Sequence, residues 1–472
     1  MYSFIGRKKE LQALEALYRK PGFQMTILYG RRRIGKSTLL QKFAEHKKVI
    51  FYTAIRSSLY RNLELLSQRV LEVLAPESLG MVFQNLEQLF SFLAQKCQKE
   101  RIVFILDEFP YMAEEYPSLL SILQKAIDTE WQQGQMYLIL CGSSLSFMEE
   151  KVLSEKSPLF GRRTSQLKLG PFSYLEAADF IPDCSFEEKA ICYGVTGGVA
   201  KYLSLWDKDR SLDQNITDLF FQKSGYLFEE PANLLTQEFR NISSYSAIIE
   251  AVASGKTRPA EIADAAHLDS SATSHALRNL VATEIVQKNQ PITDEKNRKK
   301  IRYTLADTMF QFWYRFVPAA LDAIELGRGA AYYQTIVRPQ LSDYMGSIYE
   351  EMCRTYTLLA GLDGKLACFV TRTGKWWGTN PQKKEETDID VVGLDPVHKQ
   401  AVLGECKFKM EPVDKKVYES LKERNGLIDR HYQTVQYLFF ARSGFSSWLQ
   451  EQAAKEPLKL IDLQELYEGV KM

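Results

Sequence analysis

The chain lacks the patterns that mark a membrane-spanning or secreted protein. No stretch approaches the eighteen or more apolar residues that a membrane-spanning helix requires. The N-terminus is polar and charged and has no signal-peptide pattern. The seven cysteines show no Cys-x-x-Cys spacing and no paired clusters, which disfavours a disulfide framework and a structural zinc site. We therefore expect a soluble cytoplasmic protein with no membrane partner.

The composition also lacks an excess of charge of one sign. Lysine and arginine total 60 against 59 aspartate and glutamate residues, for a net charge of +1. Any contact with nucleic acid must therefore come from local basic patches. The chain has no internal repeat or low-complexity segment, and its 472 residues are enough for about three domains.

The clearest positive signal is a phosphate-binding loop that follows an apolar run, Met25–Tyr29, and precedes a helical pattern. The glycines of such a loop let backbone N–H groups point at an anion, and the start of the helix adds its positive dipole end. Lys36 would place a charge at the β- and γ-phosphates, and the Ser37 hydroxyl would ligate Mg²⁺. The spacing predicts a nucleoside triphosphate site formed by Gly30, Arg31, Arg32, Arg33, Ile34, Gly35, Lys36, Ser37 and Thr38.

A second apolar run, Ile102–Leu106, ends in two carboxylates and reads as a strand buried on both faces. Asp107 would hold Mg²⁺ directly or through water, and Glu108 would orient or deprotonate the attacking water. Taken alone, such a pair also fits an ordinary helix N-terminus. The phosphate-binding loop upstream favours the catalytic interpretation.

A third buried strand, Met136–Cys141, ends in Gly142-Ser143-Ser144. Ser143 is a candidate for sensing the γ-phosphate or positioning the water. The alternative is that Ser143 or Ser144 caps the next helix.

Further along the chain, three short helical patterns precede an apolar strand at Ile285 and a hairpin from Pro291 to Tyr303. This order predicts a winged helix-turn-helix. The hairpin carries five cations, and the third helix carries polar side chains where base edges would be read. These residues are Lys296, Arg298, Lys299, Lys300 and Arg302 on the hairpin, and Ser271, Thr273, Ser274, Arg278 and Asn279 on the helix. The pattern favours DNA as partner, with a solvated hairpin or a protein-docking domain as alternatives.

The last third of the chain contains a second group of reactive side chains, on two predicted strands. Because side chains alternate along a strand, Asp388 and Asp390 share one face of the first strand, and Glu405 and Lys407 share one face of the next. Paired strands would bring carboxylates and an ammonium to one point. This is the arrangement of a Mg²⁺ site for phosphodiester hydrolysis, although a Glu-x-Lys pair is also common on a solvated strand face.

Several of these motifs together resemble the archaeal-type ATPase family of AAA+ and STAND-like P-loop proteins, which occurs in archaea and bacteria. The resemblance rests on Phe4–Leu11, the loop Gly30–Ser37, Asp107-Glu108-Phe109, Cys141–Ser144, and Phe160–Arg163 followed by Leu169–Ser173. It implies ATP as the nucleotide and Mg²⁺ as its metal. It also places Gly6 and Arg7 near the adenine. Arg162 or Arg163 would reach phosphate or a neighbouring subunit's nucleotide, the second role implying a homo-oligomer.

The C-terminal third resembles the PD-(D/E)XK nuclease superfamily, and the ATPase family is known for such a domain. The resemblance rests on Asp390, Glu405 and Lys407, with Glu350 on the preceding helix and Trp376-Trp377-Gly378 before the acidic strand. It implies that Glu350, Asp390 and Glu405 are metal ligands and that Lys407 is catalytic. The proline of the motif is absent, since Ile389 precedes Asp390.

We therefore predict a multidomain α/β protein. Its expected parts are a P-loop ATPase core at 1–170, a helical lid at 171–235, a winged helix-turn-helix at 236–308, a helical linker at 309–345 and a restriction-endonuclease-like α/β domain at 346–472. The expected function is ATP hydrolysis coupled to DNA binding and to metal-dependent cleavage of nucleic acid. The alternatives are an ATP-gated DNA-binding regulator that does not cleave, and a STAND-like signalling scaffold.

Overall fold

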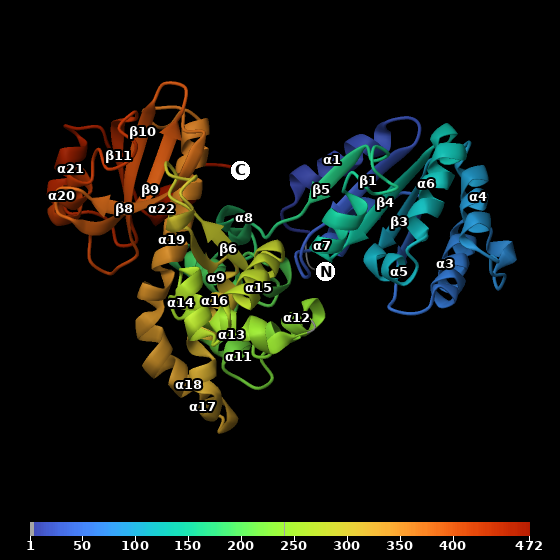
Figure 1. Cartoon of the computed structure of the whole chain (residues 1–472), viewed down its shortest axis with the longest axis horizontal. Helices are drawn as coiled ribbons and strands as arrows, with labels where there is room; N and C mark the ends of the chain where they lie inside the picture. Colours follow the sequence, from blue (N-terminus) through green and yellow to red (C-terminus); the bar gives the residue numbers. More distant parts are fainter. Residues whose placement is uncertain (1–3, 240) are drawn as a thin grey trace. The chain divides into compact units, whose positions relative to one another are not determined.

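The computed structural model describes residues 4–239 and 241–472. The chain forms two compact units (Figure 1). The first runs to Phe172 and includes Val199–Lys201, and the second contains Ser173–Gly198 and everything from Tyr202 onward. In the described ranges, no helix combines the length and the apolar content that crossing a bilayer requires.

The first unit is built on a five-stranded parallel sheet with strand order β2-β3-β4-β1-β5. Its strands are β1 (Gln24–Tyr29), β2 (Val49–Thr53), β3 (Ile102–Asp107), β4 (Met136–Gly142) and β5 (Ser165–Lys168). Every residue of β1, β3 and β4 is buried, which confirms the prediction of strands covered on both faces. Because the strands are parallel, the loops after β1, β3 and β4 meet at one edge of the sheet.

Helices cover both faces of this sheet, and alternate strand residues enter two different cores. Phe104 and Leu138 belong to the core on one face, whereas Ile105 and Ile139 belong to the core on the other. The helices of this unit are α1 (Lys8–Arg19), α2 (Lys36–Ala44), α3 (Leu59–Leu74), α4 (Leu86–Cys97), α5 (Phe109–Glu115), α6 (Leu119–Thr129) and α7 (Leu145–Phe147). The sheet that carries the nucleotide loop is therefore packed on both faces.

The second unit begins with helices and a two-stranded hairpin. The helices are α8 (Tyr174–Ala178), α9 (Phe186–Thr196), α10 (Ala200–Leu203), whose first residues belong to the first unit, α11 (Leu212–Phe220), α12 (Glu230–Glu238), α13 (Ile242–Ala253), α14 (Pro259–Ala265) and α15 (Ser270–Ala282). The antiparallel strands β6 (Val286–Asn289) and β7 (Arg302–Leu305) follow. Strand β6 precedes the predicted hairpin segment, β7 begins within it at Arg302, and residues 290–301 form the connection. Pro291 lacks the N–H that a ladder hydrogen bond needs.

A helical segment then leads into the last sheet. It contains α16 (Thr308–Phe316), α17 (Leu321–Glu325), α18 (Gly329–Tyr332) and α19 (Leu341–Leu362). The aromatic side chains of α16 pack inside the unit, as the ring of Phe312 does against Phe220 at a centroid distance of 4.7 Å. The boundary expected at residue 345 falls inside α19, which is one continuous helix.

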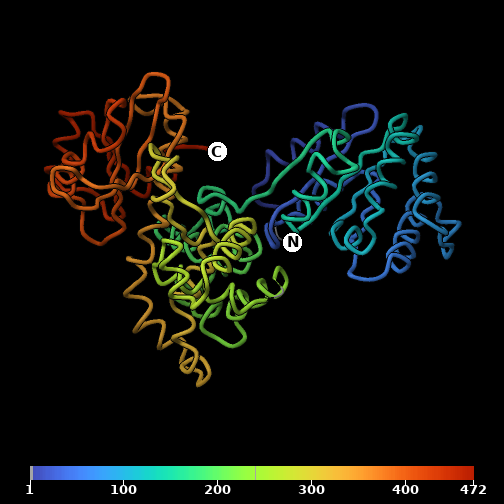
Figure 2. Tube along the Cα trace, in the orientation of Figure 1, coloured from blue at the N-terminus to red at the C-terminus, as the bar shows by residue number. Residues whose placement is uncertain are grey.

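The C-terminal sheet has five strands in the order β12-β11-β10-β9-β8. They are β8 (Arg372–Asn380), β9 (Glu385–Asp395), β10 (Gln400–Lys407), β11 (Gln433–Ala441) and β12 (Leu458–Ile461), with helices α20 (Lys415–Glu423), α21 (Ser447–Ala453) and α22 (Leu463–Glu468). Strand β9 pairs antiparallel with β8 and with β10, whereas β11 pairs parallel with β10 and with β12. Helix α19 packs against β8, β9 and β10. Figure 2 traces this sheet in orange and red, with the yellow hairpin segment running beside it.

Candidate functional site

The phosphate-binding loop lies between β1 and α2, as the spacing predicts. Gly30 has φ 155°, and a Cβ at this position would lie only 2.3 Å from the carbonyl oxygen of Leu169. Gly35 has φ 91° and caps the N-terminus of α2. Both glycines are therefore required by backbone geometry at the point where backbone N–H groups would face a phosphate.

Lys36 is the first residue of α2, and its side chain is folded onto the loop. Its Nζ donates hydrogen bonds of 2.8 Å to the carbonyl oxygens of Gly30 and Arg31. Burial lowers the pKa of Lys36, although Cys141, Glu108 and Asp107 act in the opposite direction. An ammonium held this way is already largely desolvated, which strengthens its attraction for phosphate oxygens.

The Ser37 hydroxyl donates to Asp107 Oδ2 at 2.8 Å. Asp107 is the last residue of β3 and is 3% exposed. A hydroxyl and a carboxylate oxygen at the end of adjacent elements, beside a phosphate-binding loop, are the hard oxygen ligands that Mg²⁺ prefers. The two residues therefore fit the predicted Mg²⁺ position.

Glu108 and Ser143 are joined across the ends of β3 and β4. Glu108 has φ 49°, an uncommon backbone conformation for a residue other than glycine, and such residues concentrate at functional sites. Its Oε2 accepts a hydrogen bond of 2.7 Å from the Ser143 hydroxyl. Ser144, not Ser143, is the N-cap residue of α7, and its side chain makes no capping bond there. Ser143 is thus in direct contact with the Glu108 carboxylate, and its expected part in sensing phosphate or positioning water stays a prediction.

The rest of the loop is braced by side chains from elsewhere in the first unit. Arg32 donates to the Tyr111 hydroxyl at 2.7 Å, and Arg33 has φ 69°. The carbonyl of Ile34 accepts a bond of 3.1 Å from Arg7. Tyr111 gave no sequence signal, because it lies on α5, away from the motif in the chain.

Gly6 and Arg7 lie at the start of α1. The guanidinium of Arg7 is buried, donates to the carbonyls of Ile34 and Gly170, and lies 4.2 Å from the centroid of the Phe172 ring. A Cβ on Gly6 would lie 2.6 Å from the same ring. These residues therefore hold the phosphate-binding loop against the segment after β5, and their expected contact with adenine stays a prediction.

The two arginines after β4 make contacts within the first unit. Arg162 forms a bidentate ion pair with Asp128, with distances of 2.7 and 2.6 Å. Arg163 donates to the carbonyl of Leu153 at 3.2 Å. The predicted contact of Arg162 or Arg163 with phosphate stays a prediction, and for Arg162 it would require leaving Asp128.

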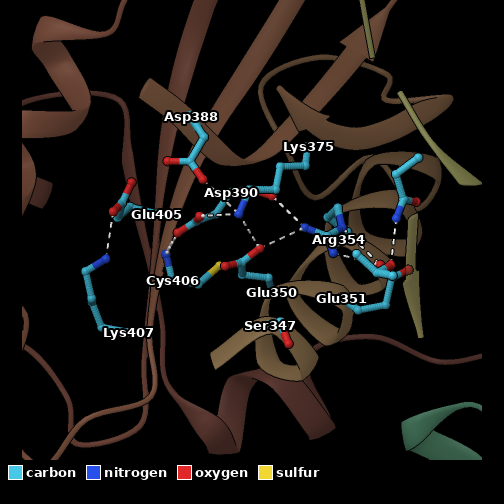
Figure 3. A network of polar contacts seen from close by, with 12 residues as sticks. Ser347, Glu350, Glu351, Arg354, Lys375, Asp388, Asp390, Glu405, Cys406 and Lys407 are labelled. Atoms are coloured by element: carbon cyan, nitrogen blue, oxygen red, sulfur yellow. Dashed lines mark hydrogen bonds and ion pairs between the residues drawn. The ribbon is translucent and has the colours of Figure 1, made fainter. Parts of the chain in front are cut away.

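The predicted C-terminal residues come from three neighbouring elements. Glu350 lies on α19, Asp390 on β9, and Glu405 and Lys407 on β10. Figure 3 shows their side chains in one network, with Lys407 directed at Glu405 at a distance of 2.7 Å. Burial and the nearby Asp390 carboxylate raise the pKa of Glu350 and of Glu405.

Three cations in this network were not predicted. Lys375 on β8 ion-pairs with Glu350, Arg354 on α19 donates to the Asp390 carbonyl at 2.8 Å, and Arg424 pairs with Glu405 at 2.8 Å. Arg354 is one helical turn after Glu350, a spacing that favours an ion pair. Lys375 and Arg424 had no such signal, because their partners are distant in the chain.

The fold and the nucleotide loop define this protein as a P-loop ATPase that binds ATP, with a separate C-terminal α/β sheet domain. Residues 4–205 match an ATPase domain predominantly from Archaea, and residues 313–421 match a domain of archaeal and bacterial proteins of unknown function. A protein of Methanocaldococcus jannaschii is 30% identical over 432 residues, which cover 90% of this chain and 92% of that protein. The chain belongs to this family of archaeal-type P-loop ATPases.

Two further proteins are similar to parts of the chain. An ATP-binding protein of Methanocaldococcus jannaschii is 48% identical over 46 residues, which cover 10% of this chain and 78% of that protein. The solved structure of a Walker-type ATPase of Pyrococcus abyssi has a TM-score of 0.50 and 19% identity, covering 66% of this chain and 96% of that one. The similarity to the Pyrococcus abyssi structure supports the P-loop ATPase fold described above.

Proposed function

We propose that this protein hydrolyses ATP at the P-loop and that the nucleotide state controls binding of DNA by the second unit. The observation that carries the first part is the convergence of Lys36, the Ser37–Asp107 pair and the Glu108–Ser143 pair at one sheet edge. These groups supply the charge, the metal ligands and the water-orienting carboxylate that phosphoryl transfer needs.

In this mechanism the loop N–H groups and Lys36 bind the phosphates, while Ser37 and Asp107 hold Mg²⁺. The bound ion supplies positive charge that offsets the charge of the phosphate oxygens. Glu108 orients the attacking water or accepts its proton, and Ser143 holds the Glu108 carboxylate in position. Arg7 holds the loop through its hydrogen bond to the Ile34 carbonyl, and Gly6 packs against the Phe172 ring beside it. Arg162 or Arg163 is a candidate for stabilising phosphate charge, in the same or a neighbouring subunit.

Helix α10 offers a route from the nucleotide to the second unit. The amide of Lys201 donates to the carbonyl of Arg33 at 3.0 Å, and Ala200 lies against Gly35. Val199–Lys201 therefore belong to the first unit, whereas Tyr202, next in the same short helix, belongs to the second. A change in the loop on ATP binding or hydrolysis would pass along this helix.

The proposed DNA-binding element is a winged helix formed by α13, α14, α15 and the β6–β7 hairpin. Ser271, Ser274 and Arg278 are exposed on α15, at the i, i+3 and i+7 spacing of one helix face. His275, which the sequence interpretation did not select, is exposed on the same face. Two of the predicted base-reading residues are unsuited to that role, because Thr273 is buried and Asn279 donates to the Tyr245 hydroxyl at 2.7 Å.

The hairpin connection presents fewer cations than predicted. Lys296, Arg298 and Lys299 are exposed. Lys300 pairs with Asp294 at 2.9 Å, and Arg302 pairs with Glu386 at 3.6 Å. We therefore assign contact with the DNA phosphate backbone to the three exposed residues, Lys296, Arg298 and Lys299.

Replacing Lys296, Arg298 and Lys299 with alanine is expected to weaken DNA binding for all sequences. The slope of log affinity against log salt concentration should fall by up to about 0.9 for each phosphate that the hairpin no longer neutralises. Fluorescence anisotropy with labelled duplexes at several salt concentrations measures both quantities.

The matched control is the alanine triple variant of Lys8, Lys9 and Lys20, which are exposed in the first unit. It removes the same charge and should leave the slope unchanged. Equal reductions in affinity and slope in both variants would show a general charge effect and would reject the hairpin as the DNA-binding surface.

A second candidate function is metal-dependent cleavage of nucleic acid by the C-terminal domain. The observation in its favour is that Asp390 and Glu405 lie on neighbouring antiparallel strands, with Glu350 on the helix that packs on them. In this candidate Glu350, Asp390 and Glu405 bind the metal and Lys407 assists the attacking water. It requires a rearrangement of the cations that now pair with these carboxylates.

A further inference from the structure

The ammonium of Lys375 lies among three carboxylates of the C-terminal domain. It is 2.9 Å from Glu350 Oε2, 2.9 Å from Asp388 Oδ2 and 3.5 Å from Asp390 Oδ1. Figure 3 shows the Lys375 side chain directed between these carboxylates, which come from α19 and β9. Lys375 thus occupies the position that a cation shared by these three residues would take.

The remaining charges of the network are paired in the same way. Glu405 lies between Lys407 at 2.7 Å and Arg424 at 2.8 Å. Asp390 Oδ2 accepts the backbone N–H of Cys406 at 3.1 Å, and Arg354 is 3.5 Å from Glu350. Glu350 and Glu405 therefore each have two cationic partners from this chain, although Arg354 also pairs with Glu351 at 2.7 Å.

This arrangement does not fit a divalent metal ion. A hard cation needs several oxygen ligands that converge on one point, and a protonated lysine at that point repels it. Throughout the described part of the chain, no group of three or more histidine, cysteine, aspartate or glutamate residues is placed to hold a metal.

The backbone at Lys375 is bonded to the hairpin connection. The N–H of Ile292 donates to the carbonyl of Lys375 at 3.1 Å, and the Ile292 side chain is buried in the core of the C-terminal sheet. Two residues along β8, the indole N–H of Trp377 donates to the carbonyl of Lys300 at 3.3 Å. The hairpin connection is thus docked on the strand that carries Lys375.

Ion pairs at the edge of the sheet support this docking. Glu386 on β9 pairs with Arg258 at 3.4 Å and with Arg302 at 3.6 Å. Glu295 in the hairpin connection pairs with Arg372 on β8. All these residues belong to the second unit, so the contacts lie within one compact body.

We propose that Lys375 is a built-in cation that closes the C-terminal carboxylate cluster to divalent metals, and that the docked hairpin holds it there. The proposal concerns metal binding by the second unit alone. It is tested without ATP or DNA, so its failure leaves the proposed ATPase and DNA-binding functions intact.

The test is Mn²⁺ binding to the nucleotide-free, full-length protein, with free Mn²⁺ measured by electron paramagnetic resonance. Wild type should bind no more Mn²⁺ than Asp390→Asn. Lys375→Met should gain one site at least tenfold tighter than any in wild type, and Lys375→Met with Asp390→Asn should lose that gain. Lys383→Met is the matched control, because Lys383 pairs with Glu423 at the surface, and it should resemble wild type.

Either of two results would overturn the closed cluster. One is a Mn²⁺ ion bound by the wild-type protein and lost in Asp390→Asn. This result would contradict the proposal even if Lys375→Met does not fold. The other is a folded Lys375→Met protein with no gain.

The hairpin part of the proposal has its own variant. Glu295→Lys with Glu386→Lys weakens docking and should create a Mn²⁺ site that wild type lacks and that Asp390→Asn removes. The added positive charge by itself would weaken Mn²⁺ binding, so the expected change has the opposite sign to a charge effect. Unchanged or weaker binding in the folded double variant would reject the role of the hairpin.

Discussion

Glu108→Gln is expected to lower the ATP turnover of this protein by about 10² to 10⁴-fold while ATP affinity stays near that of wild type. In the proposed mechanism the carboxylate orients or deprotonates the attacking water, and positioned acid–base groups contribute effects of this size. Glutamine retains the size and the hydrogen-bonding oxygen that Ser143 contacts at 2.7 Å. Steady-state phosphate release and equilibrium ATP binding measure the two quantities separately.

The matched control for this variant is Glu114→Gln, on helix α5, which begins directly after Glu108. Glu114 is exposed, so removing its charge should leave turnover unchanged. A Glu108→Gln protein that hydrolyses ATP at the wild-type rate would assign catalysis to another group.

Lys36→Met is expected to weaken ATP binding by about 10² to 10³-fold. At an effective dielectric constant of about 20, a charge pair 4 Å apart is worth about 4 kcal/mol, which corresponds to a change of this size. ATP at 100 times its wild-type dissociation constant should stabilise the wild-type fold by about 2.7 kcal/mol and the variant only slightly. Isothermal titration and thermal unfolding with and without ATP measure both effects.

The control is Lys42→Met, because Lys42 lies on the same helix, is exposed and pairs with Glu45 at 2.7 Å. The ATP affinity of Lys42→Met should equal that of wild type. Because Lys36 also holds the carbonyls of Gly30 and Arg31, circular dichroism must confirm that Lys36→Met remains folded. A folded Lys36→Met protein with wild-type affinity would contradict the assignment of this loop.

The nucleotide core could be predicted from sequence because its signals are local. The strands β1, β3 and β4 are continuous apolar runs, and each ends at a loop whose polar residues share one sheet edge. The placement of Asp388 and Asp390 on one strand, and of Glu405 and Lys407 on the next, could be predicted in the same way from the two-residue repeat of a strand. In each case the spacing along the chain determines the position in space.

The contacts that change the interpretation are not local. Lys375 meets its carboxylates through the pairing of β8 with β9 and the packing of α19, and neither fixes a spacing in the chain. The same is true of the hairpin, whose cations suggested a free basic surface although Lys300 and Arg302 pair with other side chains. The predicted boundary at residue 345, between the helical linker and the C-terminal domain, falls within the continuous helix α19.

The central claim is that ATP at the P-loop controls DNA binding. The most direct measurement is DNA affinity of the Glu108→Gln protein, by fluorescence anisotropy, with saturating ATP and then with saturating ADP. Because this variant retains ATP, we expect the two affinities to differ by at least about tenfold, a coupling of about 1.4 kcal/mol, and the difference to vanish when Lys36→Met is added. Equal DNA affinities with ATP and ADP, in a protein that binds both nucleotides, would contradict the account.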